Sequence, residues 1–171
     1  MPDELGRRHL LVNLADFTLK LVDGSRTAFD ARVIVGTPFQ RSPVFSAAVT
    51  AVELNPYWRV PDKIARFELL PRIQNDPRYL ADNNLQVLAT RDGRTVTIDP
   101  ETVDWSALGP DRFPYRLRQE PGLENALGRI KLQMANRWDV YLHDTPAREL
   151  FERTVRSFSH GCIRVENPFD L

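Results

Sequence analysis

The chain is poor in cysteine, in net charge and in long apolar runs. A single cysteine among 171 residues excludes an internal disulfide. The 23 basic and 23 acidic residues balance, which gives no reason to expect binding to nucleic acid or to an anionic membrane surface. No apolar run is long enough to span a bilayer, and residues 1–8 lack the apolar core of a secretory signal. A chain of this length suits one domain with a full hydrophobic core.

Short apolar or alternating runs predict β-structure in the first half of the chain. The turn signals Asp23-Gly24, Gly36-Thr37-Pro38 and Asn55-Pro56 end these runs. Several short strands at this spacing indicate a sandwich or a barrel. The expected strands cover residues 10–13, 18–22, 31–35 and 44–54.

The middle of the chain has a mixed pattern. A helix is predicted after Pro61-Asp62, where Pro71 can interrupt it, and a strand pair is predicted on either side of Asp92-Gly93. A further turn at residues 77–81 and a helical segment at 102–108 are expected as well. We therefore expect an insertion at about residues 62–114, of the kind that covers or shapes a site.

The last third returns to strands, at residues 129–134 and 138–142. A helix is expected to begin near Pro146 and to run to about Val155, where Ser157 and Phe158 break it. Both ends of the chain look cut, since Met1 can be an added start and residues 168–171 read as a continuing segment. We therefore interpret residues 1–171 as one excised domain.

The lone Cys162 and the histidines His143 and His160 are the candidate catalytic groups. A thiol is only slightly ionised at neutral pH, so a nucleophilic cysteine needs a neighbour that takes its proton. His160 is two positions away, whereas His143 lies at a strand end from which a strand, a helix and a return can bring it back. Gly161 lets the backbone approach a substrate, and its N–H and that of Cys162 are candidate oxyanion donors. These parts describe acyl transfer through a thioester.

Other interpretations of these residues exist. A lone cysteine is often a small buried apolar group, and His143 can be a hydrogen-bonded core histidine. Arg164 is a candidate anchor for a substrate carboxylate, although arginines at such positions are usually on the surface or salt-bridged. Tryptophans such as Trp138 usually belong to the core. His143, His160 and Cys162 with Asp144 could also ligate zinc, but their spacing matches no structural-zinc pattern.

The chain resembles the L,D-transpeptidases, the YkuD-type catalytic domains. The signature is His143 followed, after residues 144–158, by Ser-His-Gly-Cys at 159–162. Residues 55–61, Asn-Pro-Tyr-Trp-Arg-Val-Pro, and residues 121–131, Pro-Gly-Leu-Glu-Asn-Ala-Leu-Gly-Arg-Ile-Lys, also resemble family segments. The stretch between these two segments is similar to the capping insertion of the larger Gram-negative members. Arg164 stands where many members have Asn.

The resemblance implies a β-sandwich catalytic core, a mixed α/β capping insertion and a short helix before the cysteine motif. It implies that Cys162 attacks a donor tetrapeptide stem of peptidoglycan, with His143 as general base and acid and with Asp144 orienting His143 through its backbone. The resulting thioester is passed to the diaminopimelate amine of a second stem, giving a 3→3 cross-link. No metal or organic cofactor is implied.

The same resemblance assigns roles to the residues around these groups. His160 lines the site, Gly161 contributes backbone to the oxyanion hole, and the candidate substrate contacts are Arg164, Ser159, Tyr141 and Trp138. Carbapenems are expected as inhibitors because they acylate the same thiol. A periplasmic location is inferred from the location of the substrate.

Three alternatives remain open at this point. The same thioester can be hydrolysed, or captured by a lipoprotein, with identical chemistry at the thiol. A papain-like cysteine endopeptidase is less consistent with the order of residues, since its nucleophile normally precedes its histidine. A non-catalytic wall-binding module would require an inert Cys162.

Overall fold

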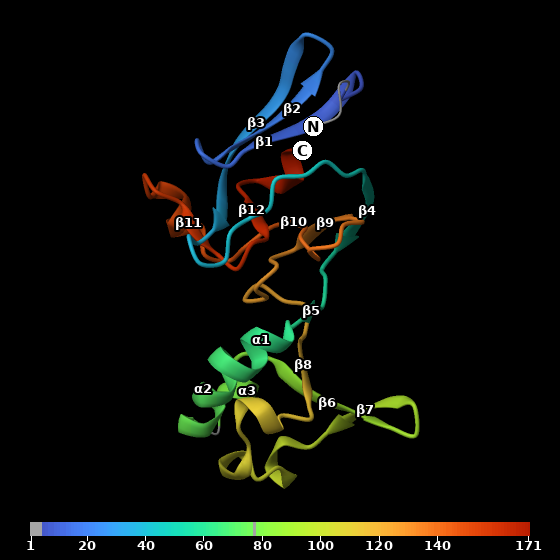
Figure 1. Ribbon diagram of the computed structural model, residues 1–171, viewed down its shortest axis with the longest axis vertical. Coiled ribbons are helices and arrows are strands. Elements are labelled where there is room, and N and C mark those ends of the chain that lie inside the picture. The colour runs from blue at the N-terminus through green and yellow to red at the C-terminus, as the bar shows by residue number, and fades with distance from the viewer. Residues whose placement is uncertain (1–4, 77) are drawn as a thin grey trace. The chain divides into compact units, whose positions relative to one another are not determined.

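The structure is a computed structural model that describes residues 5–76 and 78–171. These residues divide into two compact units, of which unit 1 comprises 5–56 with 126–171 and unit 2 comprises 57–125. Strands predominate over helices along the described chain (Figure 1), which confirms the prediction of a mainly β protein. Within the described residues no helix is both long and apolar enough to cross a membrane.

Unit 1 is built on one sheet with the strand order β1-β2-β3-β12-β10-β9-β4, and β11 pairs with β3 beside this path. The pairs β10–β12 and β11–β3 are parallel, and the others are antiparallel. The strands are β1 Arg8–Asn13, β2 Thr18–Asp23, β3 Arg26–Gly36, β4 Val49–Leu54, β9 Ile130–Met134, β10 Leu142–His143, β11 Ser157–Ser159 and β12 Ile163–Val165.

Strands β2 and β3 show how the sequence forms this sheet. In β2 the apolar Leu19 and Leu21 are buried and Lys20 between them is exposed, as expected for a strand with one face on the core. In β3 the consecutive Val33, Ile34 and Val35 are all buried, because the end of this strand lies inside the sheet between β2 and β12. Figure 1 shows β1, β2 and β3 as the blue strands of unit 1.

The predicted strand at residues 138–142 is wrong over most of its length, since β10 contains only Leu142 and His143. Its beginning is a loop that Asn136 organises. The Asn136 amide donates to the carbonyls of Met134 and Val140 at 2.8 and 2.7 Å, and its Oδ1 accepts from the amides of Trp138 and Val140. Alternating hydrophobicity at 138–142 did not reveal this side-chain-to-backbone turn.

The long helix expected from Pro146 is replaced by a 3₁₀ helix, η5, at Arg148–Glu152. Phe151 on this turn is buried, whereas Val155 is exposed beyond it, so the apolar spacing did not mark one continuous face. Ser157 and Phe158 do not simply break a helix but begin strand β11, which pairs with β3. The strand expected at 44–54 is present only over Val49–Leu54. A second 3₁₀ helix, η6, covers Pro168–Asp170.

Unit 2 has a sheet in the order β5-β8-β6-β7 together with short helices. The expected strand pair around Asp92-Gly93 is confirmed as β6 and β7. Pro77, the first residue of the turn expected at 77–81, lies outside the described residues. The elements are β5 Trp58–Arg59, α1 Asp62–Ile64, η1 Ala65–Leu69, α2 Leu70–Asn75, α3 Tyr79–Asp82, β6 Leu85–Arg91, β7 Arg94–Ile98, η2 Pro100–Thr102, η3 Trp105–Ala107, η4 Pro110–Arg112 and β8 Arg116–Gln119.

The helical run of unit 2 passes through Pro71 without a break. Proline lacks the N–H that would close an ordinary helical turn, and here the preceding segment η1 is a π-helix in which the amide of Leu70 bonds to Ala65 O. The wider turn accommodates the missing donor. The run packs Leu69, Leu70 and Ile73 against Val87 and other apolar side chains of the sheet, so unit 2 has a hydrophobic core of its own.

Candidate active site

The parallel pairing of β10 and β12 brings the candidate catalytic residues together. Leu142 is in register with Ile163, and His143 with Arg164; the amide of Ile163 also donates to Tyr141 O at 3.1 Å. Leu142 and Ile163 both project into the core of unit 1. Successive side chains in a strand point to opposite faces of the sheet. The neighbours of these two residues therefore belong to the opposite face.

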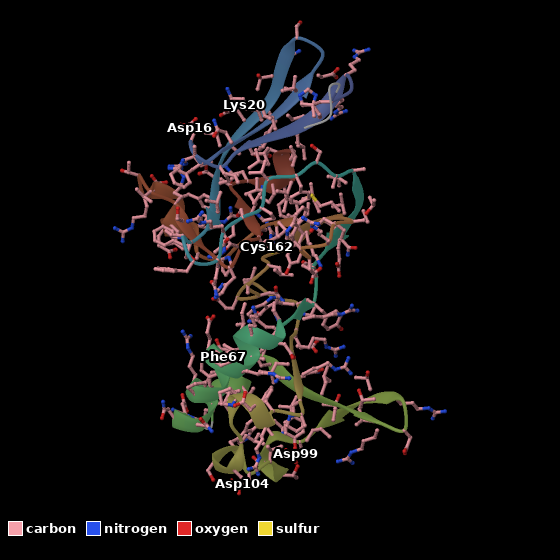
Figure 2. All side chains as sticks on the ribbon, viewed as in Figure 1. Asp16, Lys20, Phe67, Asp99, Asp104 and Cys162 are labelled. Carbon is pink, nitrogen blue, oxygen red and sulfur yellow. The ribbon has the colours of Figure 1, made fainter. Side chains whose placement is uncertain are left out.

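Four of the candidate residues lie on that opposite face. His143 belongs to β10 and Tyr141 directly precedes this strand, while Arg164 belongs to β12 and Cys162 directly precedes it. The rings of Tyr141 and His143 lie 5.6 Å apart between centroids, which agrees with the strand alternation. Cys162 precedes the first residue of β12, and Figure 2 labels it within unit 1. The sheet register thus places the thiol beside Tyr141 and diagonally across from His143.

His143 is buried, and one hydrogen bond fixes the orientation of its ring. Its Nδ1 lies 2.5 Å from the carbonyl oxygen of Asp144. Because a carbonyl oxygen only accepts, Nδ1 carries the proton and Nε2 is the unprotonated nitrogen. Burial, and secondly the positive charge of Arg164, lower the pKa of His143 to about 3. The imidazole is therefore neutral at physiological pH.

The carboxylate of Asp144, unlike its backbone carbonyl, forms its hydrogen bonds with residues other than His143. Its Oδ2 accepts from the amide of Arg129 at 2.9 Å and its Oδ1 accepts from Arg148 at 2.6 Å. Its own amide donates to Ile130 O at 2.9 Å. The carboxylate of Asp144 is thus an anchor for the backbone that presents the carbonyl to His143.

The thiol of Cys162 is partly buried, and burial raises its pKa. The backbone and the hydroxyl of Tyr141 act in the opposite direction through hydrogen bonds, because such bonds stabilise the thiolate. Sγ also lies 3.9 Å from the carbonyl oxygen of Asp139. At neutral pH the site therefore holds a thiol and a neutral imidazole rather than a preformed ion pair.

The turn before the thiol is held by two serine hydroxyls. Ser159 Oγ donates to Cys162 O at 2.5 Å and accepts from the amide of Gly161 at 3.1 Å. Ser42 Oγ donates to Gly161 O at 2.7 Å and accepts from the amide of Gly36 at 3.0 Å. Gly161 adopts a φ of 115°, a backbone conformation that favours glycine. No local pattern in the sequence marked Ser42, which lies 119 positions before Gly161.

The remaining predicted residues lie at different depths. His160 is exposed, and Ser159 is buried with its hydroxyl inside the turn. Trp138 is 42% exposed and stacks on Phe45 with centroids 4.9 Å apart, so it is not a core residue. Arg164 is partly buried, and its Nε has no hydrogen-bond partner in the part of the chain that the structure describes. Among those same residues no group of His, Cys, Asp and Glu side chains has the arrangement of a metal site.

The family model for the YkuD family, described as L,D-transpeptidase catalytic domain, matches residues 7–171. The chain belongs to this family. It is also 38% identical over 162 residues to a protein of Haemophilus influenzae named "Putative L,D-transpeptidase". The aligned region covers 95% of this chain and 32% of that relative, so the chain spans about a third of the relative's length. As a member of the YkuD family, the chain is an L,D-transpeptidase catalytic domain.

Proposed function

We propose that this L,D-transpeptidase domain forms 3→3 cross-links in peptidoglycan through a thioester on Cys162. The observation that supports this proposal best is the shared face of β10 and β12, where Cys162 and His143 lie diagonally across one strand pair. A thiol nucleophile requires a neighbouring base with an unprotonated nitrogen, and the hydrogen bond to Asp144 O leaves Nε2 of His143 in that state.

In the first half-reaction, His143 Nε2 accepts the proton of Cys162 as Sγ attacks the carbonyl carbon at the L-centre of diaminopimelate. The bond to the terminal D-Ala breaks, and His143 returns the proton to the leaving amine. A thioester with the donor stem remains. In the second half-reaction, the diaminopimelate amine of an acceptor stem attacks the thioester carbonyl and the C–S bond breaks. The proton that the amine loses passes to His143 Nε2 and from there to Sγ of Cys162.

The raised pKa of Cys162 and the low pKa of His143 favour general-base catalysis over a standing thiolate–imidazolium pair. Proton transfer then accompanies attack. The tetrahedral intermediate needs hydrogen-bond donors at its oxyanion, for which we propose the turn at Gly161 and Cys162. Because the amide of Gly161 donates to Ser159 Oγ, the amide of Cys162 is the principal candidate and Gly161 shapes the turn.

We propose His160, Tyr141, Trp138 and Arg164 as residues that line the substrate site. Trp138 follows the Asn136 turn, and the carbonyl of the next residue, Asp139, lies beside Sγ. Arg164 is in register with His143, and a guanidinium can pair with a stem-peptide carboxylate. Ser159 acts through the turn rather than through direct contact, since it is buried. A periplasmic location follows from this substrate.

The decisive experiment is incubation of the protein with purified disaccharide-tetrapeptide, read by mass spectrometry. A cross-linked dimer with release of D-Ala is expected, and a tripeptide product alone would instead indicate a carboxypeptidase. The reduced protein should also gain the mass of a carbapenem. Cys162→Ala should abolish both results, and full activity of this variant would refute the mechanism.

We further propose that the insertion at about residues 62–114, which falls in unit 2, contributes to substrate selection. Unit 2 has its own core, so residues 57–125 are the natural segment to replace with a short linker. The replacement should change the acceptor preference or the rate of cross-linking while the thiol still reacts with a carbapenem. Unchanged kinetics with tetrapeptide substrates would refute this role.

A further inference from the structure

Unit 2 contains a cavity of about 520 Å³. It is lined by residues from α1 and η1, from the end of β6, and from the segment that leads into β8; Figure 1 shows these elements in green to yellow. The charged and aromatic residues of its wall are Asp62, Arg66, Arg91, Phe113, Tyr115 and Arg116. Its volume is within the range typical of small-molecule sites.

The cavity has an excess of positive charge. Its one carboxylate, Asp62, forms an ion pair of 2.9 Å with Arg66. Within residues 5–76 and 78–171, no carboxylate lies at ion-pair distance from Arg91 or Arg116. Among the described residues, two guanidinium groups on the wall therefore lack a carboxylate partner, and a ligand with carboxylates would complement them.

Two of the three arginines are held in place before any ligand binds. Arg116 Nη2 donates to Thr90 Oγ1 at 3.2 Å and to Thr95 Oγ1 at 3.0 Å. Arg66 Nη1 donates to Pro110 O at 3.2 Å, besides its pair with Asp62. Side chains that are already ordered lose less conformational entropy on binding, so the arrangement favours recognition of a fixed oxyanion geometry.

The apolar part of the wall is rigid as well. Phe113 is 5% exposed and meets Tyr115 edge-to-face at 6.0 Å between ring centroids. Tyr115 in turn lies 6.1 Å from Trp105. An aromatic surface beside arginines suits a ligand with carboxylates on an aliphatic backbone, and it suits a bare inorganic anion less well.

We propose that this cavity binds the carboxylates of a peptidoglycan stem peptide, as a substrate-binding site in unit 2. The choice of ligand rests on the proposed function. A tetrapeptide stem carries more carboxylates than amines, so its charge complements the unneutralised Arg91 and Arg116. The catalytic face of unit 1 contributes none of the lining residues.

The test uses the full chain with Cys162→Ala, which binds substrate without turnover. Disaccharide-tetrapeptide is titrated while the amide and arginine side-chain NMR signals are followed, and the Kd is measured by calorimetry. We expect the signals of Thr90, Arg91 and Arg116 to shift. Adding Arg91→Gln and Arg116→Gln should weaken binding about tenfold, because each removes a charge-assisted contact.

Arg94→Gln in the same background is the matched control. Arg94 faces Arg91 across the β6–β7 hairpin but does not line the cavity, so its loss changes the net charge as much as Arg91→Gln alone does and should leave the Kd unchanged. Two further titrations use the peptide with amidated carboxylates and inorganic phosphate. The amidated peptide should lose the Arg91 and Arg116 shifts, and phosphate should bind much more weakly than the peptide.

Three results would overturn the proposal: peptide shifts that spare Arg91 and Arg116, an equal loss of affinity in Arg94→Gln, or phosphate binding as tight as peptide binding. Unfolding midpoints of all variants should match, and a single Arg91→Gln variant, altered at an exposed side chain, is used if the double variant is destabilised. Failure of the proposed function is seen separately, as the absence of cross-links and of a carbapenem adduct with unaltered Cys162.

Discussion

His143 and Asp144 are adjacent in the chain, and Nδ1 of His143 donates to the carbonyl oxygen of Asp144 over 2.5 Å. The base is thus oriented by backbone, while the carboxylate of Asp144 is bound by the Arg129 amide and by Arg148. Any change that moves the Asp144 side chain should also move the carbonyl that orients the base.

Gly128→Ala is the sharpest perturbation of this arrangement. A Cβ at Gly128 would lie 2.3 Å from Asp144 Oδ2, and the φ of +60° is unfavourable for alanine. We expect the rate of acylation by the donor stem to fall at least tenfold, because the displaced carbonyl no longer fixes the tautomer and orientation of His143. The measurement is single-turnover acylation with tetrapeptide.

Gly24→Ala provides the control for backbone strain. Its φ is also +60°, but nothing lies within 4 Å of the added Cβ. Both variants should lose about 1 kcal/mol of stability from the conformation itself, while only Gly128→Ala should lose activity in proportion to the clash. Equal activities would mean that the Asp144 anchor has no part in orienting His143.

The turn that presents the thiol gives a second prediction. Ser42→Ala removes the hydroxyl that bridges Gly36 N and Gly161 O, and the loss of two part-buried hydrogen bonds should cost about 1–3 kcal/mol of unfolding free energy. The rate of carbapenem acylation should also fall. Ser46→Ala, at an exposed position of the same segment, should change neither, and equal effects of the two variants would contradict the bridging role.

Contacts close in sequence were predictable, and distant ones were not. The turns at Asp23-Gly24 and Asp92-Gly93 mark the ends of strand pairs because the turn residues themselves set the hairpin. The Ser42–Gly161 bridge joins residues 119 positions apart, and no pattern around Ser42 differs from that of an ordinary loop serine. The parallel register of β10 and β12 is likewise a property of the whole sheet.

The candidate site shows the same difference between features that the local sequence predicts and contacts that depend on the whole sheet. The sequence motif was sufficient to nominate Cys162 and His143, because their residue types carry the chemistry. It did not reveal that Tyr141 contacts the thiol, since that depends on the register of β12 against β10. It also suggested a continuous strand through 138–142, where the side chain of Asn136 competes successfully for the backbone.

Direct alkylation of Cys162, which requires the free thiolate, should have an alkaline midpoint. Burial raises its pKa, and the hydrogen bond from the Tyr141 hydroxyl partly opposes this rise. The midpoint of iodoacetamide alkylation should therefore lie above the ordinary value of about 8.5, and Tyr141→Phe should move it still higher. A midpoint that is lower in Tyr141→Phe would show that the hydroxyl does not stabilise the thiolate. Tyr79→Phe on α3 of unit 2, which also removes a tyrosine hydroxyl, should leave the midpoint in place.

The buried His143 should make the protein less stable in acid. Burial lowers its pKa in the folded state to about 3, whereas an unfolded histidine titrates near 6.5. Between these values the unfolded chain binds the additional proton, so the unfolding free energy falls as the pH decreases from about 6.5 towards 3. For a shift of this size the loss is on the order of a few kcal/mol.

Denaturant unfolding at pH 7 and at pH 4.5 measures this loss, and His143→Gln isolates the contribution of the imidazole. The variant has no group that protonates at this position, so its stability should decline less between the two pH values than that of the natural chain. His9→Gln on β1, where Nδ1 interacts with Gly6 O at the surface, should retain the full decline. If His143→Gln and the natural chain lose the same free energy, the imidazole is not the group whose protonation is linked to folding, and its assignment as a neutral, desolvated base would have to be abandoned.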